Sequence, residues 1–539
     1  SSFLEKIKLA FELDDTAFES IVNGFKAEYN TGLESASASG LATMIPSYVT
    51  TLPTGKETGT YLSLDLGGST LRVCAVELLG NCNSKVTEIR RHIAPNDPLR
   101  TSGATAFFDW IVDTVTELLQ RIGHDTVYAE GPLSMGICWS FPVDQTSISD
   151  GKILRMGKGF TIGGIEGYDL AGLFEQSFKR RNVNVKVMAL LNDTVGTLVA
   201  HAYSNPDVRV GFIYGTGVNA AYPEKVRRII KLRDQQQIYT ADTTMLVNTE
   251  IDIFGNDTYL PRNKYDKQLD ENHSQPNFQL YEKMMSGACI GELVRLSALD
   301  LIGEGHLFEG HQPMELDKAM EFGTAVTSDI ESHLNNDPKA RLDHFKGLLS
   351  FKDGYLVSQK DLDIFSKLCV IVSDRAARLA AAAMASLIEQ QPELINEAGP
   401  IVIGVNGSTY EKYTRMHDRI CTSLTRWFGA EVGRRIKVEV ATDGGSIGGA
   451  LIAMLAEKEE KRRLRSTYQT DQSYGIAIDN TKKQPLDLSS KPLNREVAVS
   501  TRSPSLFGCL FGWLTPSRTK RRDRSSLIEE TVNMKQEKA

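Results

Sequence analysis

The amino-acid sequence predicts an α/β protein with more than one domain, and two observations lead to this prediction. The chain has 539 residues, which is too many for one compact hydrophobic core. After residue 60, short apolar runs alternate with amphipathic helical stretches, which indicates a largely parallel sheet covered by helices. Strands are expected at 61–66, 71–79, 133–138, 185–191 and 210–214, and helices at 107–121 and 170–179.

The sequence predicts helices at both ends of the globular part. Residues 1–38 follow a helical pattern, and Asp14 and Asp15 mark the boundary between two helices. The second half of the chain is richer in helix than the first and then returns to buried strands. We expect helices at 280–301 and 360–391, strands at 400–405 and 436–441, and a glycine cluster followed by an apolar helix that ends near Leu455.

Composition excludes several classes of function. The chain is 41% hydrophobic and 24% charged, as in ordinary soluble globular proteins. A formal net charge of −7 argues against a nucleic-acid partner for the whole chain. The seven cysteines are scattered and never spaced as Cys-x-x-Cys, which predicts neither a disulfide framework nor a zinc site. No cluster of histidine and cysteine has metal-ligand spacing. No stretch has the length and apolarity of a membrane span or signal peptide, so we expect a cytoplasmic protein.

One glycine-rich turn joins the first two expected strands. The segment from Leu62 to Arg72 reads LSLDLGGSTLR, so an acid, two glycines and two hydroxyls follow an apolar strand. Gly67 and Gly68 allow a tight turn that brings N–H groups to an anion, and Asp65 can hold a hydrated Mg²⁺. The alternative interpretation is a simple β-hairpin turn.

Three more polar turns follow apolar strands. Asn192 and Asp193 come directly after the strand at 185–191, where a carboxylate can act as a general base toward a substrate hydroxyl, or can merely cap the next helix. The turns at 215–219 and 443–449 are again rich in glycine, and the second opens a helix whose N-terminus can meet a nucleotide. Four such turns in one chain favour a phosphate-binding protein.

The order of these motifs resembles the hexokinase family from Phe3 to Leu455. The matching blocks are IPSYVTTLP, LDLGGSTLR, WSFPVDQ with a following GKGF, LLNDTVGT, GTGVNAAY, NTE, YEKMMSGACIGELVRL, GVNGSTY and DGGSIGGA. The resemblance implies the two-lobed, actin-like ATPase fold, with a sugar in a central cleft and ATP beside it. The implied organisation is N-terminal helices and a link at 1–59 that pack with the large lobe, a small lobe at 60–193, a large lobe at 194–444, a closing helix at 445–456 that packs with the small lobe, and a polar, disordered tail at 457–539.

The resemblance also implies a role for individual residues in ATP-dependent phosphorylation of the 6-hydroxyl of a hexose. Asp193 is the implied general base, and Lys158 the implied partner of the transferred phosphoryl group. The sugar-binding positions are Ser140, Gly157, Lys158, Asn192, Asp193, Asn219, Glu250 and Glu282. Without the resemblance, Glu250 and Glu282 would read as surface charges. The positions on the ATP side are Asp65, Gly67, Gly68, Ser69, Thr70, Arg72, Gly215, Thr216, Gly407, Ser408 and Gly444, with Mg²⁺ held by Asp65 through water.

The chain departs from the common family pattern in ways that bear on the sugar. Gly157 stands where glucose-type members have threonine, and Ile251 stands where they have tryptophan. Both changes reduce side-chain size near the sugar, and the glycine-lysine-glycine form at 157–159 resembles the fungal N-acetylglucosamine kinase branch. N-acetylglucosamine is therefore the expected substrate. Glucose, mannose or fructose is the alternative. Thr70 and Asn406 replace the family's asparagine and aspartate, which keeps open a catalytically weak sugar sensor or regulator.

The expected tail contains an apolar, aromatic segment followed by a basic cluster, within residues 505–524. This pattern predicts contact with an anionic membrane surface, aided by acylation of Cys509, or a nuclear fraction through the basic cluster. A short helix that packs on the core, or plain disorder, is the alternative. The expected assembly is a monomer or a homodimer.

Overall fold

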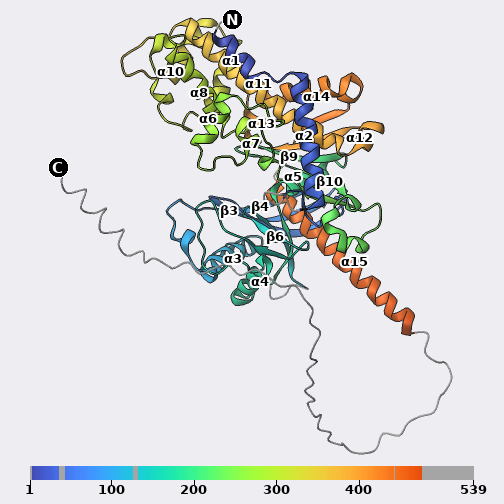
Figure 1. Ribbon diagram of the computed structural model, residues 1–539. Helices are drawn as coiled ribbons and strands as arrows, with labels where there is room; N and C mark the ends of the chain where they lie inside the picture. Colours follow the sequence, from blue (N-terminus) through green and yellow to red (C-terminus); the bar gives the residue numbers. More distant parts are fainter. Residues whose placement is uncertain (1–2, 36–42, 125–130, 442–443, 476–539) are drawn as a thin grey trace, which may run out of the picture. The chain divides into compact units, whose positions relative to one another are not determined.

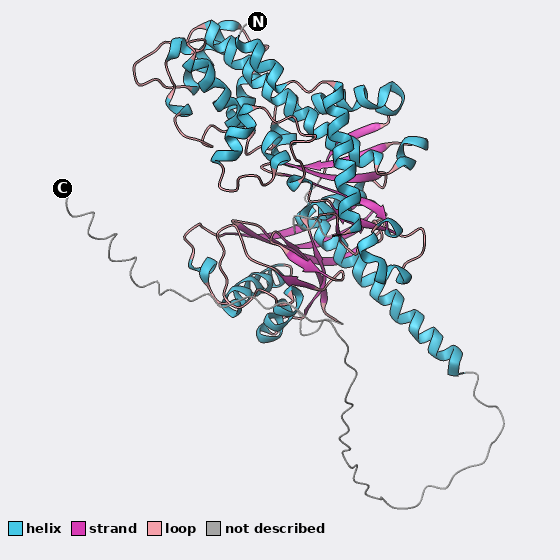
Figure 2. Ribbon diagram, viewed as in Figure 1, coloured by secondary structure: helices cyan, strands magenta, loops and turns pink. Residues whose placement is uncertain are grey.

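The computed structural model describes residues 3–35, 43–124, 131–441 and 444–475, with side chains up to Arg465 (Figure 1). The predicted membrane-docking segment at 505–524 therefore lies outside the described residues. In this part of the chain the strands form two larger sheets and one short hairpin, and the helices surround them (Figure 2).

The first sheet has five strands in the order β4-β3-β2-β5-β8. Its strands β2, β5 and β8 run parallel, whereas β2, β3 and β4 form an antiparallel meander. Helices α3 and α4 pack against each other and cover this sheet. The bounds are β2 Thr58–Leu66, β3 Thr70–Gly80, β4 Asn83–His92, β5 Leu133–Trp139, β8 Val185–Leu191, α3 Ala104–Arg121 and α4 Leu170–Arg181. The hairpin consists of β6 Val143–Gln145 and β7 Gly151–Ile153.

The second sheet has six strands in the order β1-β11-β10-β9-β12-β13. Here β9, β12 and β13 run parallel, and β9, β10, β11 and β1 are antiparallel neighbours. The bounds are β1 Ile45–Pro46, β9 Val208–Tyr214, β10 Val218–Lys225, β11 Thr244–Asn248, β12 Ile401–Asn406 and β13 Ile436–Val440.

The prediction of one largely parallel sheet was wrong, because both sheets are mixed. The strands themselves lie close to their expected positions. The glycine-rich turns at 67–69 and 215–217 are each short enough to return the chain beside the strand that it has just left. They therefore make antiparallel pairs, β2 with β3 and β9 with β10.

Helix α5 (Asp193–Ser204) lies between the two sheets. It contacts β9, β10 and β12 of the six-stranded sheet and β5 of the five-stranded sheet. The π-helical turn Gly444–Gly448 packs closely on α5, where a Cβ at Gly196 would lie 2.4 Å from the carbonyl oxygen of Gly444. The parts of the chain that follow the strand ends of both sheets therefore meet around α5.

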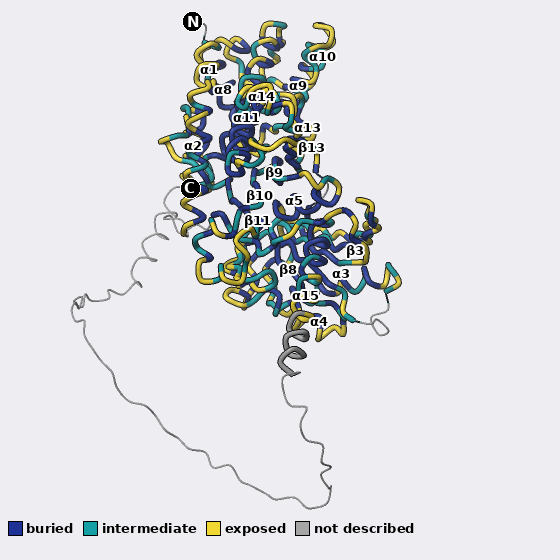
Figure 3. The backbone as a smooth tube through the Cα atoms, turned by 90° about the vertical axis from the view of Figure 1, so that its right-hand side faces the viewer, coloured by how far each residue is buried: buried dark blue, intermediate teal, exposed yellow. Residues whose placement is uncertain are grey.

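The expected N-terminal helices are α1 (Phe3–Phe11) and α2 (Asp15–Glu34). Asp14 caps α2, since its side chain accepts a hydrogen bond of 2.7 Å from the backbone N–H of Ala17. Both helices pack on the buried α11 (Gln359–Glu389), which the tube in Figure 3 shows as a mostly dark-blue stretch. The other helices are α6 Lys264–Asn272, α9 Thr324–Ser332, α10 Pro338–Leu348, α12 Pro392–Asn396, α13 Ser408–Lys412 and α14 Met416–Gly433.

The single helix expected at 280–301 is in fact two, α7 (Leu280–Met285) and α8 (Ile290–Gly303). The break follows from the backbone hydrogen bonds of the link. The N–H of Gly287 donates to the carbonyl oxygen of Gly215 at 2.9 Å, and that of Ala288 donates to Thr216 at 3.1 Å. Because these N–H groups donate to the turn at 215–217, they cannot donate to the preceding helical turn, and the helix is interrupted.

The closing helix is longer than expected, because α15 runs from Gly449 to Gly475. The charged run at 457–465 continues this helix and does not begin the predicted tail. In the structure Lys461 and Arg463 pair with the glutamates four positions earlier, Glu457 and Glu459. The carboxylate of Glu457 also accepts a hydrogen bond from Ser134 of β5 at 2.7 Å. None of the helices in the described ranges has the length and apolar character needed to cross a membrane.

Candidate active site

Polar residues from three neighbouring parallel strands meet at one edge of the five-stranded sheet. Asp65 lies near the end of β2, Ser140 follows β5, and Asn192 follows β8. The N–H of Ser140 donates to the carbonyl oxygen of Leu66 at 3.3 Å, so the ends of β2 and β5 stay in register. The carboxyl edge of parallel strands is where open α/β sheets bind ligands.

Asp193 is the first residue of α5 and stands next to this edge. Asn192 caps the helix, because its side-chain oxygen accepts a hydrogen bond from the N–H of Thr194 at 2.9 Å. The Asp193 side chain reaches solvent although protein atoms surround it. Partial desolvation raises the pKa of its carboxyl, the charge of Asp65 raises it further, and the charge of Lys158 lowers it. The three charged groups therefore lie near one another.

Asp65 is held by Arg72 across the β2–β3 pair. The guanidinium donates two hydrogen bonds to one carboxylate oxygen, of 3.1 Å and 2.6 Å. A glycine is required at position 445 above this pair, since a Cβ there would lie 2.7 Å from both Asp65 Oδ2 and Arg72 Nη2. The turn before α15 thus covers the pair closely. The charge of Asp65 acts on Asp193, and both residues offer carboxylate oxygens, the ligands that a hard cation such as Mg²⁺ prefers.

Lys158 lies against the first glycine-rich turn. A Cβ at Gly68 would come within 3.1 Å of the Lys158 Cδ atom, so glycine permits this approach. Lys158 has a left-handed backbone (φ 54°), and its ammonium lies 5.7 Å from the ring centre of Phe141. The side chain of Ser69 is exposed at the tip of the turn, as a group that meets phosphate must be.

A set of carboxylates and amides extends from the six-stranded sheet. Asn219 of β10 donates to the side-chain oxygens of Asn248 at 3.0 Å and of Glu250 at 3.1 Å. Asn248 also donates to Glu250 at 2.6 Å. Glu282 of α7 accepts a hydrogen bond of 2.8 Å from the N–H of Val218. Fixed acceptors and amides of this kind are what the hydroxyl groups of a sugar require.

The acids of this set repel one another. Burial raises the pKa of Glu250 to about 7, and the nearby charge of Asp252 adds to this effect. Burial together with the charge of Glu282 raises the pKa of Asp252 to about 7. Burial also raises the pKa of Glu282. The Oδ1 atom of Asp252 is buried and accepts no hydrogen bond from any residue that the structure describes, so one acceptor of this set is still available to a ligand.

The second glycine-rich turn is built from three distant segments. The carbonyl oxygen of Gly215 accepts hydrogen bonds from the N–H of Gly287 at 2.9 Å and from the hydroxyl of Thr409 at 2.7 Å. Gly407 has φ 134°, and a Cβ there would lie 2.5 Å from the Tyr214 carbonyl. Thr216 and Ser408 are exposed beside this junction. Glycine turns leave room for a nucleotide, and the backbone N–H groups and exposed hydroxyls beside them can bind its phosphates.

The structure therefore brings together several of the residues expected on the sugar and ATP sides. Asp65, Lys158 and Asp193 lie together, Asn219 and Glu250 are directly bonded, and Gly444 packs on Thr197 of α5. Asp443, expected to open the last helix, is outside the described residues. Gly157 stands in open space, because no atom of the described residues other than its chain neighbours lies within 4 Å of a Cβ placed there.

Sequence reasoning missed three residues of this region, Asn248, Asp252 and Arg100. Asn248 is the first residue of the NTE motif, and Asp252 lies two residues after it. The motif could therefore have pointed to both residues. Arg100 carries no sequence signal, because its partners are the carbonyl oxygens of residues 6 to 58 positions away.

Comparisons with known proteins agree with this geometry. Two family models described as hexokinase match residues 3–203 and 209–455. Hexokinase-1 of Schizosaccharomyces pombe is 33% identical over 457 residues, which cover 84% of this chain and 91% of that protein. Hexokinase-2 of Candida albicans is 34% identical, over 85% of this chain and 93% of the relative. A solved hexokinase of Schistosoma mansoni complexed with glucose has 30% identity and a TM-score of 0.69, and covers 84% of this chain and 97% of its own.

The fold and the grouped residues define an ATP-dependent sugar kinase of the two-lobed α/β type. The chain belongs to the hexokinase family. The general activity of the family, phosphorylation of a hexose by ATP, applies to it.

Proposed function

We propose that this chain phosphorylates the 6-hydroxyl of a hexose, with Asp193 as the general base. The observation that supports the proposal is the position of Asp193, which lies at the N-terminus of α5 close to both Asp65 and Lys158. A base is most effective when its pKa is near the working pH. Desolvation raises the pKa of Asp193 in that direction, while the charge of Lys158 and hydrogen bonds from backbone N–H groups at the start of α5 act against this rise.

In the proposed reaction Asp193 accepts the proton of the sugar hydroxyl as the hydroxyl oxygen bonds to the γ-phosphorus, and the bond from that phosphorus to the bridging oxygen of ADP breaks. Lys158 offsets negative charge on the transferred group. Mg²⁺, bound with ATP, would neutralise charge on the β- and γ-phosphates, and Asp65 would hold it through water. The residues Asn192, Asn219, Glu250 and Glu282 would orient the sugar.

We propose N-acetylglucosamine as the preferred sugar, and the support comes from Gly157. This position is next to the lysine proposed to act on the phosphoryl group, and none of the described residues except its chain neighbours comes within 4 Å of a Cβ placed there. A sugar with a 2-acetamido group needs such room. Ile251 supports the proposal only indirectly, because its side chain is fully buried in the core. Glucose, mannose or fructose remains the alternative.

The test is release of ADP by the purified chain with Mg-ATP and each of the four sugars, with Asp193→Ala as the blank. The expected result is Asp193-dependent turnover that is highest with N-acetylglucosamine. In Gly157→Thr the preference should move toward glucose. Glucose preferred by the wild type would overturn the sugar assignment but leave the hexose kinase intact.

A sugar sensor is the second candidate, and Asn406 is the observation that favours it. Its amide donates a hydrogen bond of 3.2 Å to the backbone carbonyl oxygen of Ala441. The family often has a carboxylate at this position, which could not donate this bond. Tight sugar binding by the wild type without Asp193-dependent turnover would support the sensor over the kinase. The tail contacts, the cytoplasmic location and the oligomeric state stay predictions.

A further inference from the structure

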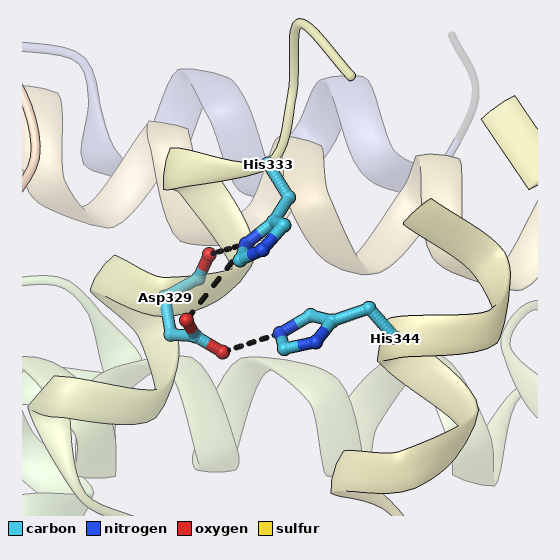
Figure 4. A group of neighbouring side chains, drawn as sticks. All are labelled: Asp329, His333 and His344. Atoms are coloured by element: carbon cyan, nitrogen blue, oxygen red, sulfur yellow. Dashed lines mark hydrogen bonds and ion pairs between the residues drawn. The ribbon is translucent and has the colours of Figure 1, made fainter. Parts of the chain in front are cut away.

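Three potential metal ligands lie close together at helices α9 and α10, outside the active site. Asp329 lies in α9, His333 follows the C-terminus of α9, and His344 comes from α10 (Figure 4). One ligand atom from each side chain lies within 4.8 Å of the other two. All three side chains are half-buried, with 30% to 40% of their surface exposed, so an ion can reach them from solvent.

Asp329 joins the two histidines. One oxygen of its carboxylate lies 2.6 Å from Nε2 of His344, and the other lies 3.8 Å from Nδ1 of His333. The two imidazole rings are stacked, with centroids 4.0 Å apart and an angle of 19° between their planes. Figure 4 shows the two rings beside the Asp329 carboxylate, one near each of its oxygens.

A backbone contact orients His333. Its Nδ1 atom lies 2.8 Å from the carbonyl oxygen of Asp329, one turn earlier in the helix. Since a carbonyl only accepts, the Nδ1 atom carries the proton in this contact, which leaves the lone pair on Nε2. Histidines that bind metals are commonly oriented in this way by a carbonyl or carboxylate.

The distances are close to those that a metal would impose. Metal–nitrogen and metal–oxygen bonds of about 2.0–2.2 Å place neighbouring ligand atoms roughly 3–3.5 Å apart. The 2.6 Å contact between Asp329 and His344 is shorter than this, and one ring nitrogen of His333 lies within 4.8 Å of a ligand atom of each of the other two residues. Small rotations of three partly exposed side chains bring the three ligand atoms into this range.

We propose that Asp329, His333 and His344 bind one divalent transition-metal ion that links the end of α9 to α10. Two imidazoles and one carboxylate suit zinc, cobalt, nickel or copper, whereas Mg²⁺ and Ca²⁺ prefer oxygen ligands alone. The site is therefore separate from the Mg²⁺ that accompanies ATP. Water completes the coordination shell. The rival interpretation is that Asp329 accepts hydrogen bonds from both histidines and no ion binds.

The test uses the full chain without an affinity tag, stripped of metal, and titrated with zinc(II) against a chromophoric chelator and with cobalt(II) by visible absorption. One equivalent should bind to the wild type. Loss of a direct ligand in His344→Ala or Asp329→Asn should weaken that equivalent by more than about 100-fold, since even the outer partners of metal ligands contribute 10–100-fold. Zinc should also raise the melting temperature of the wild type and not of these variants.

His311→Ala is the matched control, because His311 pairs with Asp353 on the surface in a contact that includes one imidazole only. Cys421 and His417 lie 3.6 Å apart and are present in every variant, so any zinc that they bind is a constant background. The proposal is overturned if the wild type binds no stoichiometric zinc. It is also overturned if His344→Ala and His311→Ala bind zinc as the wild type does.

Discussion

The side chain of Arg100 connects Lys158 to the first glycine-rich turn. Its guanidinium donates hydrogen bonds of 2.8 Å to the carbonyl oxygens of Lys158 and Gly68, and further bonds to those of Ile93 and Ala94. The side chain is almost completely buried and stacks on Phe160, with 4.3 Å from the guanidinium carbon to the ring centre. One arginine therefore fixes two segments proposed to act on the phosphoryl group.

Arg100→Lys should lower kcat much more than it changes either KM. A lysine keeps the charge but cannot supply the planar set of donors that holds both carbonyls. Misplacement of Lys158 by about 1 Å is expected to reduce kcat about 100-fold. Steady-state kinetics with each substrate at saturation measure the effect. Arg90→Lys, an exposed arginine on β4, is the control. A variant with wild-type kcat would show that Arg100 has no positioning role.

The stability of the protein should fall as the pH rises from about 5 to 8, because of Glu250 and Asp252. The pKa of each is raised to about 7, from 4.5 and 3.8. Between the unfolded and folded pKa values the folded state therefore holds more protons, so its stabilising contribution is complete at low pH and is lost as pH passes 7. Melting temperatures measured across this range should show a slope that becomes flatter in Glu250→Gln.

The same pair should make sugar binding depend on pH. Sugar hydroxyls donate to ionised carboxylates, so binding should release protons near neutrality and strengthen as pH rises from 6 to 8. Titration calorimetry in buffers of different ionisation heat measures the proton release. Glu19→Gln, on the exposed face of α2, is the control for a lost glutamate. Equal proton release by Glu250→Gln and the wild type would contradict this assignment.

Local signals explain what the sequence predicted. The strands that end near Asp65 and Asn192 are short apolar runs, and a polar turn follows each of them directly. Neighbouring residues therefore predict both the strand and the sheet edge at which it ends. The cap at Asp14 was readable for the same reason. The antiparallel pairing of β9 with β10 and of β2 with β3 could not be predicted in this way, because the geometry of the turn determines it and the hydrophobic pattern does not.

Long-range contacts explain what the sequence did not predict. The break between α7 and α8 depends on Gly287, which contacts Gly215 far away in the chain. Arg100 acts through carbonyl groups, which every residue carries and which leave no pattern. His333 and His344 are separated by a loop, and their spacing matches no metal motif although the fold brings their rings together. In each case the signal exists only in three dimensions.

Replacing Lys158 should move the acidic limb of the rate profile to higher pH. The charge of Lys158 lowers the pKa of Asp193, so in Lys158→Met that pKa rises and the base is protonated at a pH where the wild-type base is still ionised. The measurement is kcat against pH with saturating sugar and ATP. Overall activity also falls, but the position of the limb reports the base. Lys152→Met, an exposed lysine of β7, should leave the limb in place. A limb that moves to lower pH would contradict the assignment of Asp193.

The buried pair of Arg375 and Asp266 should contribute more to stability than surface ion pairs do. The guanidinium of α11 donates hydrogen bonds of 2.7 Å and 2.6 Å to the two carboxylate oxygens, and both side chains are about 98% buried or more. Asp266→Ala leaves the arginine charge buried without its partner. The free energy of unfolding should fall by about 3–5 kcal/mol.

Asp113→Ala is the matched control for this change, because Asp113 also lies in a helix and pairs with an arginine, Arg181, but at the surface. Its loss should cost less than about 1 kcal/mol, since exposed pairs are solvated and screened. Urea denaturation of both variants and the wild type at pH 7 gives the comparison. Equal losses in the two variants would mean that water or a rearranged acceptor compensates Arg375, and that the pair does not anchor α6 to α11.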